Sequence, residues 1–302
     1  MKQANDNGYL FETEVQEIEQ AVQRQPDLDL TAFRVFAVRT LTNPEAEVSK
    51  YHVADTDSGS AMLIRGLADY PQIRISGSEI TNNIYKVGVA FAIPTADVEQ
   101  SRDWGRSLDL EFVDRAKREV DSKMNKFMYI GDNEFGINGI YDLSGVTTYS
   151  GTDFDTASLN ITNEMTAAVN TIPIQFRNRP YSLVIADQEW KKAQKIGNTY
   201  SNETWLDMFK KQHPNITVEV ESVLDAGTVL GSGGTVSQGS ALLIPKDRGL
   251  CRVPIGYLGQ VLFKPEANAT FDEKIEAKVK SRLGAIEVPF ATSVVKITGW
   301  NT

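Results

Sequence analysis

The residue types that most often carry catalysis or bind metal are scarce in this chain of 302 residues, which has two histidines, His52 and His213, and one cysteine, Cys251. A zinc site needs several Cys and His ligands, which these three residues cannot supply within one chain. His213 follows a predicted helix, where a cation stabilises the helix end, and His52 lies at the base of a predicted hairpin. Cys251 stands in an apolar strand, so we predict a buried thiol. We expect no metal ion.

The sequence also lacks the familiar motifs for a nucleophile or a phosphate. It contains no Gly-x-Ser-x-Gly elbow, no Gly-x-x-x-x-Gly-Lys loop and no His-Glu-x-x-His helix. The stretch 225–240 is rich in glycine, but it has no lysine and no following helix that would cradle a phosphate. Asp132, Asn133 and Glu134 beside Gly136 do not have the spacing of a calcium loop. We therefore predict no catalytic residue and no cofactor.

Composition and charge exclude further classes of protein. Hydrophobic content of 41% and charged content of 24% are ordinary for a soluble globular protein. The net charge is −9, and the basic residues are scattered singly or in pairs, so we expect no sequence-specific contact with nucleic acid. No run of about 18 apolar residues is present, which argues against a membrane span. A single cysteine cannot form an internal disulfide, so a reducing compartment is expected.

The strongest structural signal is a long helix predicted from about 110 to 129. Its apolar residues recur every three or four positions with charged residues between them, which is the pattern of an amphipathic helix. They are Phe112, Val113, Ala116, Val120, Met124 and Phe127. Asp109 is the predicted N-cap and Gly131 the predicted left-handed C-cap. A shorter helix is predicted at 95–102, and Gly-Ile-Asn-Gly-Ile at 136–140 predicts a tight return after the long helix.

The elements around that helix change type along the chain. Residues 1–50 contain a short helix whose apolar stripe ends before Pro26, followed by an extended segment at 33–38. Residues 51–93 alternate like strands around a part rich in turn-forming residues. Helices are then predicted at 159–172, 188–195 with Asp187 as N-cap, and 202–212, and strands at 181–186, 216–220, 241–244, 251–253, 260–263, 271–282 and 288–297. The late strands are expected to pair with the strands that precede the long helix.

The helix ending in Gly-Asp, the Gly-Ile-x-Gly-Ile return and this order of elements resemble the major capsid proteins of tailed phages. Their HK97-type fold is shared by the encapsulin shell proteins. The resemblance implies an α+β fold with an N-terminal arm at 1–50 and an extended hairpin, the E-loop, at 51–83. It further implies a peripheral domain at 84–150 and 256–302, which holds the spine helix at about 110–129, and an α/β axial domain at 151–255.

By the same resemblance, copies of the chain form pentamers and hexamers that close an icosahedral shell around a double-stranded DNA genome. The protein would be found in the virion, after assembly in the host bacterial cytoplasm, and its further partners would be portal, scaffold or decoration proteins. The residues implied in assembly are Ile196, Gly197, Asn198, Thr199 and Tyr200 at the capsomer axis, Ser58, Gly59, Arg65 and Gly66 in the extended hairpin, and Phe11, Val15 and Ile18 in the arm. Lys50 and Lys86 lie near the hairpin, but no motif identifies an asparagine partner, so we expect no covalent cross-link.

Two alternatives remain open at the level of sequence. The first shares the fold and differs in contents: an encapsulin-type shell that packages cargo enzymes. The second is a soluble α/β enzyme or binding module with a pocket under the loop 225–240. Closed particles that contain DNA would favour the capsid protein, and a stable monomer would favour the enzyme or binding module.

Overall fold

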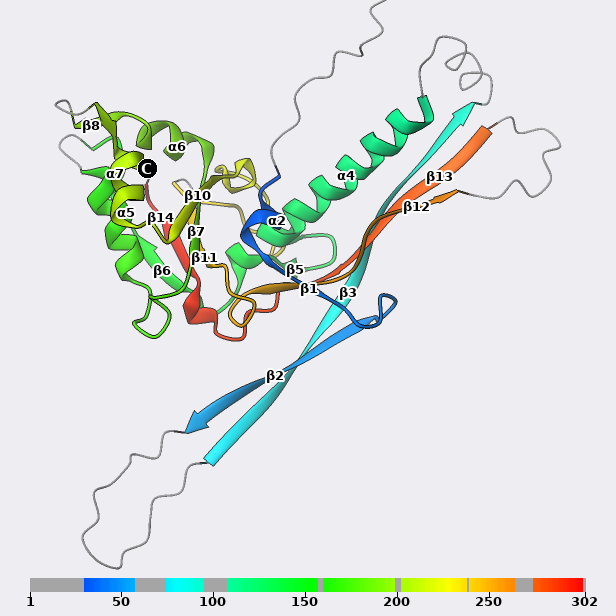
Figure 1. The fold of residues 1–302 in the computed structure, drawn as a ribbon, viewed down its shortest axis with the longest axis horizontal. Coiled ribbons are helices and arrows are strands. Elements are labelled where there is room, and N and C mark those ends of the chain that lie inside the picture. The colour runs from blue at the N-terminus through cyan, green and yellow to red at the C-terminus, as the bar shows by residue number, and fades with distance from the viewer. Residues whose placement is uncertain are drawn as a thin grey trace, which may run out of the picture.

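The structure is a computed structural model, and two five-stranded sheets and one long helix dominate it (Figure 1). It describes residues 30–57, 74–94, 108–156, 160–198, 202–237, 239–263 and 274–300. Several predicted features lie outside these residues. They are the helix at 95–102, the arm residues Phe11, Val15 and Ile18, the hairpin residues Ser58, Gly59, Arg65 and Gly66, and the axial residues Thr199 and Tyr200.

The predicted spine helix is α4, Leu108–Ile130. Val120 and Met124 on its apolar stripe are almost completely buried, as the helical period predicts. Phe112 is the exception, because its side chain is 38% exposed and stacks on Phe91 with ring centroids 6.0 Å apart. The prediction of Asp109 as N-cap is wrong, because the helix already begins at Leu108.

The first sheet has the order β1-β12-β13-β3-β2. Its strands are β1 Ala37–Thr40, β12 Arg252–Phe263, β13 Lys274–Gly284, β3 Arg74–Pro94 and β2 Val48–Asp57. The long strand β3 has two partners along its length: β13 pairs with it from Ile84 to Pro94, and β2 pairs with it from Arg74 to Asn83. In Figure 1 the β2–β3 hairpin therefore projects away from α4 and from the rest of the sheet. The predicted pairing of late strands with strands before the spine helix is confirmed for β12, which pairs with β1, and for β13, which pairs with β3, but it is wrong for the strand at 241–244, which lies in the second sheet.

Residues of β3 alternate between two environments, as the strand period predicts. Tyr85, Val87 and Phe91 face α4 and pack against its core. Lys86 and Ala90 stand on the opposite face and are exposed. Among the described residues the helix covers only one face, and on the opposite face the positions around Gly88 and Ala90 are exposed.

The second sheet has the order β10-β7-β11-β14-β6. Its strands are β10 Ile216–Val220, β7 Tyr181–Ile185, β11 Ala241–Pro245, β14 Val295–Thr298 and β6 Thr147–Ser150. Every residue of β7 and β11 is buried. Leu183 and Leu243 face one core and Val184 faces the other, so both sides of the sheet are covered. Because both faces are buried, the sequences of β7 and β11 are continuous apolar runs and do not alternate between apolar and polar residues.

Helices α5 Ile161–Asn170, α6 Asp187–Ala193 and α7 Trp205–Gln212 accompany the second sheet. Asn160 caps α5 by accepting a hydrogen bond from the backbone N–H of Asn163, and Thr204 forms a capping box with Asp207 at α7. The predicted cap of α6 is wrong, because Ala186 occupies the N-cap and Asp187 is the first helical residue. The remaining short elements are α2 Ala32–Val35, β4 Gly131–Asp132, β5 Ile137–Asn138, β8 Ile196–Asn198, β9 Glu203–Thr204, η1 Ile140–Asp142, η2 Ser222–Leu224 and η3 Ala291–Ser293.

Three further predictions need correction. The extended segment at 33–38 is instead the helical turn α2 followed by β1, because Asn125 on α4 accepts a hydrogen bond from the backbone N–H of Ala32. The two strands predicted at 251–253 and 260–263 are one strand, β12, whose register shifts near Gly256 and Gly259 hide its alternation. The strand at 288–297 is split into η3 and β14, and β14 pairs with β11 and β6 in the second sheet rather than with the strands that precede the spine helix.

Candidate assembly elements

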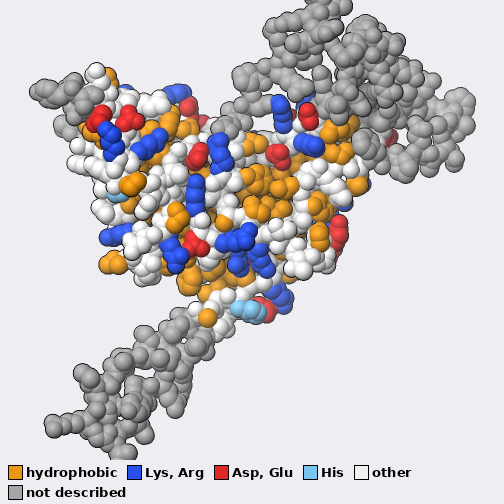
Figure 2. Space-filling view, viewed as in Figure 1, with side chains coloured by type: hydrophobic (Ala, Val, Ile, Leu, Met, Phe, Trp, Pro, Cys, Tyr) orange, Lys and Arg blue, Asp and Glu red, His pale blue; other side chains and the backbone are white. Residues whose placement is uncertain are grey.

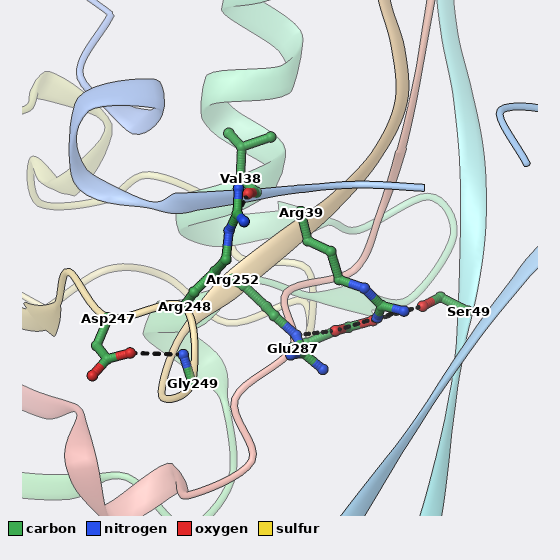
Figure 3. Close-up of polar contacts among 8 residues, drawn as sticks. All are labelled: Val38, Arg39, Ser49, Asp247, Arg248, Gly249, Arg252 and Glu287. Carbon is green, nitrogen blue, oxygen red and sulfur yellow. Dashed lines mark hydrogen bonds and ion pairs between the residues drawn. The ribbon is translucent and has the colours of Figure 1, made fainter. Parts of the chain in front are cut away.

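A buried carboxylate holds the base of the β2–β3 hairpin. Glu287 is completely buried, and its backbone forms an isolated bridge with Arg252. Its side chain accepts hydrogen bonds from Arg39 Nη1 at 3.0 and 3.1 Å, from Arg252 Nε at 2.6 Å and from Ser49 Oγ at 2.7 Å. We call these four residues the hairpin-base cluster. It connects β1, β2 and β12, and it thereby fixes the direction in which the hairpin leaves the sheet (Figure 3).

Two neighbours extend this cluster. The guanidinium of Arg252 lies over the ring of Tyr51 on β2, with its central carbon 5.6 Å from the ring centroid. The exposed Arg248 donates from Nε to the carbonyl oxygen of Val38 on β1, at 2.9 Å. The β2–β3 hairpin is thus anchored only at its base, since the described side chains beyond Tyr51 are exposed or half-buried.

A second buried carboxylate anchors the start of the described chain. Glu221 accepts hydrogen bonds from Thr31 Oγ1 at 2.6 Å and from Asn125 Nδ2 at 3.0 Å. Thr31 also shares a hydrogen bond of 2.7 Å with the hydroxyl of Tyr129, and burial raises the pKa of that phenol far above its usual value. These contacts fix a part of the predicted arm, around Thr31 and Ala32, against the spine helix.

The return after the spine helix brings three glycines together, Gly131, Gly139 and Gly231, which we call the glycine junction. Gly131 has φ +80°, as the predicted left-handed C-cap requires, and a Cβ there would lie 1.9 Å from the carbonyl oxygen of Ile137. A Cβ on Gly139 would lie 2.4 Å from Gly131 N, and one on Gly231 would lie 1.8 Å from the same Ile137 oxygen. Gly231 N donates to Ile130 O at 2.7 Å, so the loop 225–237 is joined to the helix end.

The loop 225–237 closes on itself. Leu230 N donates to Gly234 O, and Val236 N donates to Thr228 O, each at 2.8 Å. The side chains of Leu230 and Val236 are buried in the same core as α4. Apolar side chains therefore occupy the space beneath the loop, where the alternative reading of the sequence placed a binding pocket.

The described part of the predicted axial tip is the small β8–β9 hairpin. Ile196 pairs with Thr204 and its side chain is 57% exposed. A Cβ on Gly197 would lie 2.5 Å from Trp205 Cδ2, so only glycine allows the tip to lie against α7 at this position. Asn198 pairs with Glu203 through its backbone. The structure thus places these three predicted residues together on one hairpin.

The residues considered for chemistry have structural roles. His213 is the C-cap of α7, as predicted, and burial lowers the pKa of its imidazole. His52 is exposed on β2. Cys251 is completely buried, as predicted, and desolvation raises the pKa of its thiol to about 12. The Asp132 carboxylate, in the sequence that faintly matches a calcium loop, is 2.5 Å from Lys123 Nζ, and this bond lowers its pKa.

Within the described part of the chain, no group of three or more His, Cys, Asp or Glu residues is arranged to hold a metal ion. Among the same residues no helix is both long and apolar enough to cross a membrane.

Two of the buried carboxylates, Glu287 and Glu221, were not predicted from the sequence. Each is an acidic residue beside or within an apolar strand-like run, which is the signal that could have singled them out. Their partners, however, are distant along the chain: Arg39 is 248 residues from Glu287, and Thr31 is 190 residues from Glu221. No local pattern could have supplied those pairings.

Comparison with solved structures finds the same fold in several phage and phage-like particles. The capsid of Myoviridae phage XM1 has a TM-score of 0.74 at 12% identity, with 95% of this chain and 97% of that chain covered. The capsid of the native GTA particle has a TM-score of 0.70 at 13% identity, with 99% and 98% covered. A virus-like particle from Pyrococcus furiosus has a TM-score of 0.55 at 12% identity, with 87% and 90% covered. These likenesses confirm the HK97-type α+β fold.

Comparison by sequence gives the family. A search of curated proteins finds no match. A family model described as "Major capsid protein" matches residues 59–299, which is most of the chain. The match includes β3, the spine helix and the glycine junction, the features on which the resemblance was first recognised. This chain belongs to the major capsid protein family.

Proposed function

We propose that copies of this chain assemble as pentamers and hexamers into the icosahedral shell of a tailed phage, around a double-stranded DNA genome. The observation that carries this proposal is the family match over residues 59–299. The fold supports it, because the XM1 and GTA structures that share it are named as capsids. The protein then resides in the virion after assembly in the bacterial cytoplasm, and a shell of this kind also contacts portal, scaffold or decoration proteins.

The domain roles that we propose for the described elements come from the resemblance to the family. The spine helix and the first sheet form the peripheral domain, and α5, α6 and α7 with the second sheet form most of the axial domain. The β2–β3 hairpin is the E-loop. It has little core of its own, so burial against a neighbouring copy offsets the entropy cost of ordering it. The β8–β9 hairpin, with Ile196 exposed at 57%, lies at the capsomer axis.

The open face of the first sheet is a suitable surface for the neighbour's hairpin. Gly88 and Ala90 on β3 have small side chains that project little from this face, and Lys280 and Lys278 on β13 lie directly across from them. Lys280 is held over the ring of Tyr257, 4.8 Å from its centroid. Small residues permit close approach of a second strand layer, and the lysines complement an acidic protein.

The first experiment is negative-stain microscopy and size-exclusion chromatography of the purified chain, with nuclease-protected nucleic acid measured in any particles. Closed shells, rings or tubes that contain protected DNA, or that package DNA with phage components, support the capsid. Shells that enclose an enzyme instead of DNA would reassign the protein to the encapsulin class. A stable monomer of 33.5 kDa at high concentration would contradict shell assembly altogether.

A further inference from the structure

Three arginines collect at the hairpin base and carry more positive charge than their carboxylate partners balance. Arg39 and Arg252 share Glu287, and the one hydrogen bond that the Arg248 side chain makes within the described part of the chain is to the backbone oxygen of Val38. Asp247 does not balance Arg248, because its side chain binds Arg179 at 2.8 Å and the backbone N–H of Gly249 at 2.8 Å. We call Arg39, Arg248 and Arg252 the arginine site.

The arginine site is accessible. The side chains of Arg39 and Arg252 are 34% and 23% exposed, and Arg248 is exposed. Figure 2 shows Lys and Arg side chains gathered where β1 and the start of β12 lie in Figure 1. Among the described residues, Arg248 Nη1 and Nη2 and Arg252 Nη1 and Nη2 have no hydrogen-bond partner. Guanidinium groups with open donors are suited to bind carboxylates in a bidentate geometry.

The chain itself contains an acidic segment that could bind the arginine site. Residues 1–29 hold seven acidic and two basic residues, so they contribute −5 of the net charge of −9. Four of the acidic residues fall within eight positions: Glu12, Glu14, Glu17 and Glu19. They lie 11 to 18 residues before Leu30, where the described chain begins. With the helix predicted before Pro26 at about 1.5 Å per residue and the following residues extended at about 3.4 Å per residue, these glutamates lie roughly 25–35 Å from Leu30, which is enough to reach a neighbouring copy.

We propose that the arginine site binds the acidic residues 12–19 of a second copy of this chain. The inference rests on the proposed shell function and specifies one of its contacts, between the arm of one copy and the hairpin base of the next. An acidic segment bound at the arginine site lies against β1 and β12. These strands carry Arg39 and Arg252 of the hairpin-base cluster, which sets the direction of the β2–β3 hairpin. A DNA backbone is the less suitable ligand, because it needs rows of exposed cations and here the buried Glu287 already stands between two of the arginines.

The test needs a full-length chain whose arginine site is vacant. Changing Glu12, Glu14, Glu17 and Glu19 to Lys removes the native ligand and leaves the site intact. A fluorescent synthetic peptide of residues 1–29 is then titrated with this chain, and its anisotropy is measured at low and high salt. Binding is expected, and it should weaken at high salt because the contact is ionic.

Arg248→Glu, added to that chain, should weaken peptide binding about tenfold or more, and Arg248→Lys should retain it within about threefold. Arg248 is chosen because Arg39 and Arg252 hold the buried Glu287, and their loss would disturb folding. Lys126→Glu is the matched control, since it reverses one exposed charge on α4 outside the site. Unchanged binding after Arg248→Glu, or an equal loss in the control, would overturn the proposal.

Mixing two variants tests whether the partner is a second copy. Chains with Arg248→Glu and chains with the four Glu→Lys changes should each assemble poorly alone. When the two are mixed, native arms can meet native sites on other copies, so particle formation should partly recover. If the arm bound its own copy, mixing would not restore particle formation.

If Arg248→Glu lowered DNA retention and left assembly unchanged, the arginine site would bind the genome instead of the arm. The peptide titration reports docking even if no variant, wild type included, closes a shell.

Discussion

At the scale of single residues, Glu287 is the side chain on which the geometry of the hairpin most depends. Its carboxylate is completely buried, and it accepts hydrogen bonds from side chains on three strands. A buried charge of this kind adds little net stability, because its desolvation offsets much of the attraction, but removing one partner leaves the others unpaired. The cluster is therefore better understood as a device that specifies orientation.

We expect Glu287→Gln to lower the free energy of unfolding by about 2–4 kcal/mol, since two guanidinium groups lose their counter-charge. The matched control is Glu79→Gln on the same hairpin, where the carboxylate binds the exposed Lys50 at 2.5 Å. That variant should unfold like the wild type, because an exposed ion pair contributes little. Urea unfolding of both variants checks the difference. Equal midpoints would show that the hairpin-base cluster does not hold the fold.

Asp132 gives the chain a predictable acid sensitivity. The hydrogen bond from Lys123 lowers the pKa of this carboxyl below its ordinary value of 3.8. A lowered pKa in the folded state contributes stability that is present above the ordinary value and is lost as pH falls through the folded one. Asp132→Asn should lower stability by about 1 kcal/mol at pH 7, and the difference from the wild type should shrink as pH falls below 3.8 and vanish once the folded carboxyl is protonated. Thermal melting across this range measures it, and a constant difference would exclude the ion pair as its cause.

At the scale of elements, the end of the spine helix is fixed by backbone packing rather than by side chains. Gly131, Gly139 and Gly231 let three chain segments approach within distances that no Cβ would allow. The junction joins the end of α4 and the β4–β5 hairpin that directly follows it to the loop 225–237, which is distant along the chain. Any side chain at Gly131 would have to separate those segments as well as adopt a left-handed backbone.

Two glycines in the same turn separate these two effects. Gly136 also has a positive φ, +62°, but nothing lies within 4 Å of a Cβ placed on it. Gly136→Ala should therefore cost only about 1 kcal/mol, which is the penalty of the left-handed conformation. Gly131→Ala should cost more than about 3 kcal/mol, because its Cβ would also overlap Ile137 O. Soluble yield and urea midpoints of the two variants test this, and similar costs would argue against a packed junction.

At the scale of the whole molecule, the two sheets share one hydrophobic core. Val184 and Leu242 of the second sheet, Val279 of the first sheet and Met124 of the spine helix belong to a single buried cluster. The described residues of the two sheets and of the spine helix should therefore unfold together rather than one after the other. A rigid body with a projecting hairpin is suited to repeated contacts, since its parts keep fixed angles from copy to copy.

The exposed axial tip should matter for assembly and not for folding. Ile196→Ser is expected to leave the melting temperature of the isolated chain within about 2 °C and to reduce capsomer formation several-fold, because it removes exposed apolar surface from the proposed contact. Ile174→Ser is the matched control, a residue of the same type that is 81% exposed and belongs to no predicted assembly region. Size-exclusion chromatography compares the two variants. Equal assembly of both variants would show that Ile196 does not contribute to the capsomer interface.

Much of the fold was predictable from local pattern. The period of the spine helix, the alternation of β3, the apolar run of β7 and the strand at 216–220 each appear where the sequence indicated. Gly131 was predictable too, because only glycine adopts the left-handed cap without penalty. The described axial residues were predicted by resemblance to a family, and whether they meet other copies stays a proposal.

The sequence by itself determined the types of the main elements and the family, because period and glycine placement depend on neighbouring residues. Only the tertiary structure decided that β12 is one strand through two register shifts, that β6 and β14 join the second sheet, and that Glu287 lies between Arg39 and Arg252. Those features depend on residues as far apart as 248 positions. A buried carboxylate is tolerated only where such distant donors converge, and local sequence carries no record of which donors those are.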